Sequence, residues 1–125
     1  MNLLLDTHVF LWWMADDRRL KTSVRSVISD PDHLVAVSAA SVWEISIKRA
    51  LGKLHAPADV PAALRDNDLD ALSITVDHAA LAGSLPRHHD DPFDRVLVAQ
   101  AMLEELTLVT HDRRLLDYDV TVIEA

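Results

Sequence analysis

Four carboxylates, widely separated along the chain, fall at the ends of predicted helices and strands: Asp6, Glu44, Asp94 and Asp112. Asp6 closes a run of three leucines and Asp112 closes an apolar run from residue 106, while Glu44 and Asp94 lie early in predicted helices. Carboxylate oxygens suit a hard divalent cation, which activates water and stabilises charge in phosphodiester chemistry. The four acids are therefore a candidate metal site, provided that the fold brings them together.

The apolar pattern predicts strands that alternate with helices along a single domain, residues 1–125. Expected strands cover residues 2–6, 34–37, 72–76, 108–110 and 120–123. Expected helices cover residues 9–14, 21–29, 38–51, a short stretch ending near 66, residues 78–85 with Asp77 as N-cap, and 92–106. This order predicts an α/β fold with three layers, α/β/α, around a central, mainly parallel sheet of four or five strands.

In such a fold, helix starts and the carboxyl ends of strands lie at the same edge of the sheet, where ligands bind. Asp6 and Asp112 reach that edge from strand ends, and Glu44 and Asp94 reach it from helix starts. Two carboxylates ~5 Å apart repel by on the order of 3 kcal/mol at an effective dielectric constant of about 20. Four together therefore require that some be protonated or that a cation lie among them. We expect a cation, bound by Asp6, Asp94 and Asp112, with Glu44 binding metal or the attacking water.

Glu44 is the best single test of function against local structure. At about 100° per residue, it falls at the edge of an apolar stripe formed by Ala40, Trp43, Ile47, Ala50 and Leu51. A carboxylate beside a packed stripe needs a partner. The alternative is a glutamate that extends out of a boundary position, or one that stabilises the helix through its macrodipole.

The three aspartates differ in how well local structure alone explains them. In the segment from Asp91 to Asp94, Asp91 is the expected N-cap and Pro92 the first helical residue, so Asp94 is preferred over Asp91 as the metal ligand. Asp94 also favours a helix start electrostatically, and Asp112 could cap a short helix. Asp6 gains little structurally beside three leucines.

Composition narrows the class of protein. The net charge of −8 argues against a general nucleic-acid binder, although Arg87, Arg95, Arg113 and Arg114 lie near the predicted acids. The chain has no cysteine, no apolar stretch of membrane-spanning length and no basic start typical of a signal peptide, so we expect a cytoplasmic protein. The sequence His88 to Asp91 matches no zinc signature and is interpreted as a loop and a cap. Thr7 and Thr110 are interpreted as cap or strand residues that could also orient water.

Five segments of the chain resemble the PIN-domain ribonucleases, and more narrowly the VapC toxins of bacterial type II toxin–antitoxin pairs. They comprise residues 4–8, 41–48, 52–54, 89–95 and 110–112, in the expected order. The resemblance implies an endoribonuclease that depends on Mg²⁺ or Mn²⁺ and uses Asp6, Glu44, Asp94 and Asp112. It also implies an RNA substrate, a homodimer and inhibition by a VapB-like antitoxin.

Two other functions remain open from the residues alone. The acids could hold a structural cation or dock a basic peptide in a non-catalytic interaction module. Alternatively, Asp6 could be the nucleophile of an aspartyl phosphatase or phosphoacceptor domain. The chain has no second acid two residues after Asp6 and no evident lysine partner after a later strand. Both absences argue against the phosphoacceptor function.

Overall fold

A parallel sheet forms the middle layer of the protein in the computed structural model, which describes residues 1–125. The strands are β1 (Asn2–Leu5), β2 (Leu34–Ser38), β3 (Asp70–Leu72), β4 (Thr107–Thr110) and β5 (Val122–Glu124). The helices are α1 (Thr7–Met14), α2 (Thr22–Ser29), α3 (Ala39–Ala50), α4 (Val60–Asp66), α5 (Val76–Ser84) and α6 (Pro92–Leu103), with a 3₁₀ helix, η1 (Arg113–Asp117).

The strand order is β3-β2-β1-β4-β5, and all four neighbouring pairs are parallel. The predicted α/β class and parallel sheet are confirmed, with five strands. Central β1 pairs with β2 and β4, so Leu5 lies beside both Val37 and Val109. Because β1 and β4 point the same way, Asp6 and Asp112 leave the sheet at the same edge.

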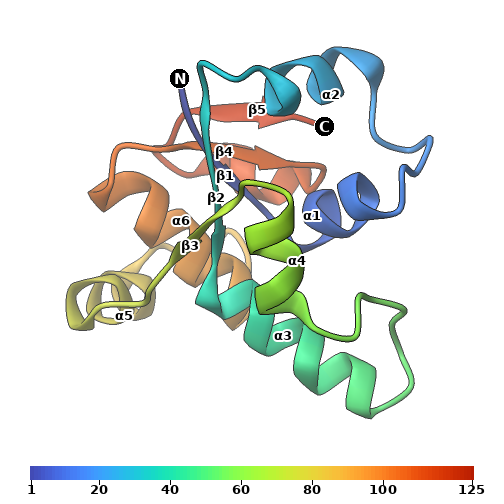
Figure 1. The fold of residues 1–125 in the computed structure, drawn as a ribbon. Coiled ribbons are helices and arrows are strands. Elements are labelled where there is room, and N and C mark those ends of the chain that lie inside the picture. The colour runs from blue at the N-terminus through green and yellow to red at the C-terminus, as the bar shows by residue number, and fades with distance from the viewer.

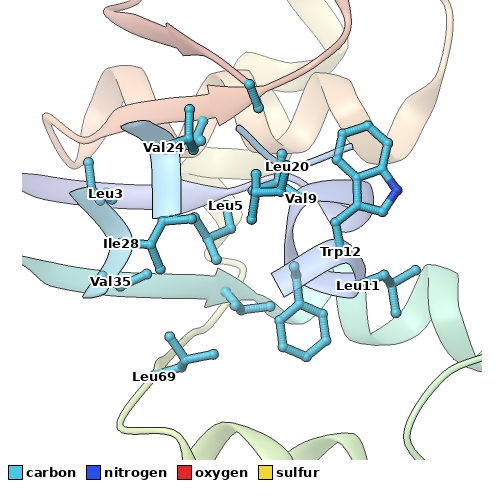
Figure 2. Close-up of a cluster of buried hydrophobic side chains, with 14 of the residues drawn as sticks. Leu3, Leu5, Val9, Leu11, Trp12, Leu20, Val24, Ile28, Val35 and Leu69 are labelled. Atoms are coloured by element: carbon cyan, nitrogen blue, oxygen red, sulfur yellow. The ribbon is translucent and has the colours of Figure 1, made fainter. Parts of the chain in front are cut away.

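Two hydrophobic cores cover the two faces of the sheet. Side chains alternate along β1, so Leu3 and Leu5 enter one core and Leu4 enters the other. The first core, shown in Figure 2, contains side chains of α1, α2 and α4, and the second contains side chains of α5 and α6. Figure 1 shows these two groups of helices on opposite sides of the sheet, which gives the three predicted layers. None of the helices combines the length and the apolar character that crossing a membrane requires.

The edge strand β3 differs from the prediction. It covers Asp70–Leu72 rather than residues 72–76, because the chain turns away to begin α5. Thr75, rather than the predicted Asp77, is the N-cap: its hydroxyl accepts from His78 N at 3.1 Å, and His78 Nδ1 accepts from Thr75 N at 3.0 Å. This reciprocal capping box satisfies two otherwise unpaired backbone donors.

The predicted packing of α3 was also wrong. Trp43 and Leu51 of the predicted stripe are each 62% exposed, whereas the buried residues of this helix are Ala40, Ser41, Glu44 and Ile45. Figure 1 shows the reason, because the second half of α3 extends beyond the sheet. The helix therefore buries the side that carries Glu44, and leaves much of its apolar stripe uncovered.

Candidate active site

A cavity of about 320 Å³ lies at the edge of the sheet where β1 and β4 end. The structure brings all four predicted acids to it. The cavity is lined by Asp6, His8, Trp12, Glu44, Lys48, Asp91, Asp94, His111, Asp112 and Arg114. The lining therefore includes a fifth carboxylate, Asp91, together with two side chains that carry a permanent positive charge.

Asp6 is buried, and both of its carboxylate oxygens are engaged. Oδ1 accepts from the backbone N–H of Val9 at 2.8 Å, which makes Asp6 the N-cap of α1. Oδ2 accepts from the Thr110 hydroxyl at 2.5 Å. The prediction that Asp6 gains little from local structure was thus wrong. Burial raises the pKa of Asp6, although the hydrogen bonds from Thr110 and Val9 oppose that rise.

Glu44 is buried beside Asp6 and has two partners of different chemistry. The Thr7 hydroxyl donates to Glu44 Oε1 at 2.6 Å, and Lys48, one turn along α3, pairs with Oε2. Thr7 is therefore neither a cap nor free to orient water, because it holds a carboxylate. The sequence analysis missed the role of Lys48, although its spacing of four residues from Glu44 is the signal for a helical ion pair.

Asp91 and Asp94 have separate tasks at the start of α6. Asp91 is the predicted N-cap, since its Oδ1 accepts from Phe93 N at 2.8 Å and from Asp94 N at 3.2 Å. Asp94 points its Oδ2 at His89 Nε2, 2.7 Å away. Burial raises the pKa of Asp94 to about 6, and the nearby charges of Asp91 and Asp6 add to that rise. Both acids line the cavity, but only Asp94 has no capping task.

Asp112 caps η1 and pairs with an arginine. Its Oδ1 accepts from Arg114 N and Nε, both at 3.0 Å, and the guanidinium Nη2 lies 2.7 Å from Oδ2. The hydrogen bond from Arg114 lowers the pKa of Asp112. Of the four arginines noted in the sequence, Arg114 alone lines the cavity. Arg113 instead pairs with Glu124, and Arg95 donates to backbone carbonyls.

His89 is the functional candidate that the sequence analysis missed. It was interpreted as part of a loop, yet its side chain is buried and reaches both Asp94 and Asp112. Ligand atoms of these three residues all lie within 4.8 Å of one another. No local pattern predicts this contact, because it depends on how the loop before α6 folds against the end of β4.

The charge in the cavity fits a hard divalent cation. Five carboxylates face two permanent cations, Lys48 and Arg114, which leaves three uncompensated negative charges when every acid is ionised. The two basic side chains provide part of the compensation, in addition to the protonation or the bound cation that the sequence analysis considered. Carboxylate oxygens remain the main donors at the cavity surface, and such donors favour Mg²⁺ or Mn²⁺.

Comparison with known proteins gives the family. A family model described as the PIN domain matches residues 3–120. The chain belongs to the PIN-domain family. This PIN domain is 34% identical over 117 residues to ribonuclease VapC22 of Mycobacterium tuberculosis, in a match that covers 91% of this chain and 89% of the relative.

Two solved structures illustrate how closely the fold of this PIN domain follows those of chains in known complexes. A chain in VapBC2 from Rickettsia felis, bound to a DNA fragment from its promoter, superposes with a TM-score of 0.74 at 14% identity, over 100% of this chain and 99% of that chain. A chain in a toxin–antitoxin complex from Klebsiella pneumoniae gives a TM-score of 0.65 at 15% identity, over 97% and 95% of the two chains. At these identities the structural likeness supports the fold alone.

Proposed function

We propose that this PIN domain is an endoribonuclease that depends on Mg²⁺ or Mn²⁺ and acts in the cytoplasm as the toxin of a type II toxin–antitoxin pair. The observation that carries the proposal is the convergence of Asp6, Glu44, Asp94 and Asp112 on one cavity with excess negative charge. The named activity of a relative that shares 34% identity over most of the chain supports ribonuclease over other phosphodiester chemistry.

Each acid has a role in the proposed site. Asp6, Asp94 and Asp112 would hold the cation, and Glu44 would bind the cation or orient the attacking water. A bound Mg²⁺ or Mn²⁺ would ionise that water and stabilise charge on the phosphate. Thr110 and Thr7 fix the carboxylates of Asp6 and Glu44, so these oxygens are preorganised.

The geometry around Asp6 disfavours the phosphoacceptor alternative. Each Asp6 oxygen accepts one hydrogen bond and keeps a lone pair for a cation, but a covalent bond from Oδ1 or Oδ2 to phosphorus would weaken the cap of α1 or the bond from Thr110. A non-catalytic module remains the meaningful competitor, and it is distinguished by whether RNA is cut.

The proposed partners are a VapB-like antitoxin and a second copy of this chain. A partially uncovered apolar stripe on α3, with Trp43 and Leu51 each 62% exposed and Ile47 38% exposed, supports contact with another protein chain. Light scattering on the purified chain, alone and with the antitoxin, gives the stoichiometry of both proposed assemblies.

Cleavage of RNA by the purified chain tests the proposed activity. We expect cleavage in Mg²⁺ or Mn²⁺, loss of cleavage with EDTA and recovery when the cation is returned. Asp6→Asn should lower the rate by several orders of magnitude without unfolding the protein, because asparagine keeps the oxygen that caps α1.

Asp90→Asn is the matched control, since Asp90 is exposed and does not line the cavity. It should retain the full rate. Undiminished cleavage by Asp6→Asn, or cleavage that survives EDTA, would contradict the proposal. A folded protein that binds antitoxin but never cuts RNA would favour the non-catalytic module.

A further inference from the structure

His89 contacts the acidic site from behind. Its Nε2 lies 2.7 Å from Asp94 Oδ2 and 3.4 Å from Asp112 Oδ2. The residue is only 6% exposed and does not line the cavity, whereas both carboxylates do. The imidazole therefore approaches the two acids from the protein interior and not from the cavity, where Arg114 pairs with Asp112.

The loop that carries His89 is held rigidly by Arg95 and Tyr118. Tyr118 Oη donates to Pro86 O at 2.7 Å and accepts from His89 N at 3.1 Å. The Arg95 guanidinium donates at 2.9 to 3.2 Å to three carbonyl oxygens of the same loop, those of Leu85, Pro86 and His89, and at 2.8 Å to that of Ala82 in the last turn of α5. Five hydrogen bonds thus fix a loop that has no helix or strand of its own, and a sixth joins it to α5.

These anchors belong to the same chain segments as the two acids. Arg95 follows Asp94 directly on α6. Tyr118 follows η1, the 3₁₀ helix that Asp112 caps. Any shift of α6 or of η1 would therefore move an acid and an anchor of His89 together. This arrangement keeps the imidazole in register with both carboxylates.

We propose that His89 is a positioning residue for the divalent cation. Its Nε2–H holds Asp94 in one orientation and, with it, the spacing between Asp94 and Asp112. This inference rests on the metal site of the proposed function. Replacing a group that hydrogen-bonds to a ligating side chain typically lowers metal affinity or activity by ~10–100-fold.

Binding of Mn²⁺ in the absence of RNA tests the inference, with free Mn²⁺ measured by electron paramagnetic resonance. His89→Ala should weaken binding by ~10–100-fold. His89→Gln should stay within a few-fold of the wild type, because its terminal amide can donate from near the position of Nε2. His89→Asn is one carbon shorter and should behave like His89→Ala.

His88→Ala is the matched control, since His88 is the exposed neighbour and packs in a T-shaped pair with the Tyr118 ring, not against an acid of the site. It should bind Mn²⁺ like the wild type. If His89→Ala does not fold, the comparison of His89→Gln with His89→Asn decides, because both keep a polar amide. Equal Mn²⁺ affinity in those two variants would overturn the proposal.

Pulsed resonance spectra of the bound Mn²⁺ give an independent readout. In the wild type we expect no nitrogen coordinated directly to Mn²⁺. A strong coupling to a coordinated nitrogen, present in the wild type and absent in His89→Gln, would show that His89 is a metal ligand and would contradict the positioning role. A wild-type chain that binds no Mn²⁺ would also overturn the inference. The expected affinity pattern without RNA cleavage would refute the ribonuclease alone, and would leave the role of His89 standing.

Discussion

The acidic site has two halves that are built differently. The inner acids, Asp6 and Glu44, are 5% and 3% exposed and each accepts a hydrogen bond from a neutral threonine hydroxyl. The outer acids, Asp94 and Asp112, have side chains 18% and 24% exposed and contact His89, with Arg114 also on Asp112.

The inner acids have a fixed geometry, whereas the charge around the outer acids can be adjusted. Short neutral donors in the core have little freedom, so the inner oxygens stay in place whatever else binds. The ion pair of Arg114 with Asp112 is solvent-facing, so it can be exchanged for a competing cation at little cost. Lys48, which is 37% exposed, has the same exchangeable character on the inner side, since it approaches Glu44 from the cavity.

Replacing the outer acid Asp94 should produce the largest change in the free energy of unfolding. The folded pKa of Asp94 is about 6 and its ordinary value is 3.8. The folded state binds the Asp94 proton more tightly than the unfolded state does. The stabilisation that comes from this proton is therefore complete below the unfolded pKa, and it is lost as the pH rises through the folded pKa. The shift of about two units corresponds to roughly 3 kcal/mol as an upper value.

The free energy of unfolding, measured in chelator from about pH 4 to about pH 7, checks this expectation. Stability of the wild type should fall across that range relative to Asp94→Asn. The control variant Asp90→Asn replaces an exposed acid and should follow the wild type. Parallel curves for wild type and Asp94→Asn would show that the pKa of Asp94 is not raised by folding. The two outer acids would then no longer differ as expected, with the pKa of Asp94 raised and that of Asp112 lowered.

Removing an inner anchor should cost somewhat less. Thr110→Val takes the hydroxyl donor from Asp6 Oδ2 and leaves a buried acceptor without its partner. The expected loss is about 1–3 kcal/mol in the free energy of unfolding. Thr107→Val, on the same strand but without a side-chain hydrogen bond to an acid, is the matched control and should change stability little. If both variants lose the same stability, the hydroxyl contributes nothing specific to Asp6.

Replacing the basic side chains Lys48 and Arg114 should give the smallest effect, and here the measured quantity is the affinity for Mn²⁺. The affinity should rise. Lys48→Met and Arg114→Gln each make the cavity more negative, so both should bind Mn²⁺ a few-fold more tightly. The gain should be larger for Lys48, whose side chain is 37% exposed against 64% for Arg114, because solvent and salt screen the arginine more.

A calorimetric titration at two salt concentrations measures that gain, with Arg113→Gln as the control because Arg113 pairs with Glu124 instead. Weaker Mn²⁺ binding by Lys48→Met would mean that the lysine supports the site, rather than competing with the cation for Glu44.

The sequence predicted the elements well where a local rule was strong. Continuous apolar runs identified the central strands, and Asp91 followed by Pro92 located the start of α6. It failed where two local rules competed. The stretch after Leu72 alternates like a strand, but Thr75 and His78 form a capping box that starts a helix. Helical periodicity found the apolar stripe of α3, but it could not show that this helix extends past the sheet.

The candidate site divides in the same way. Element ends alone placed four acids at one edge, because parallel strands and their crossover helices leave no other arrangement. The partners of those acids could not be read in this way. Thr110 reaches Asp6 across 104 positions of sequence, and His89 meets Asp112 only because two loops fold together.

By itself, the sequence determined the parallel α/β fold and which carboxylates share an edge, since both follow from apolar periodicity and chain direction. The tertiary structure alone decided how each carboxylate is held: by buried hydroxyls for Asp6 and Glu44, and by an imidazole and a guanidinium for Asp94 and Asp112. The physical reason is range. Backbone direction is fixed by local hydrogen bonding, whereas a contact within 3 Å or so between distant side chains exists only after both cores have packed.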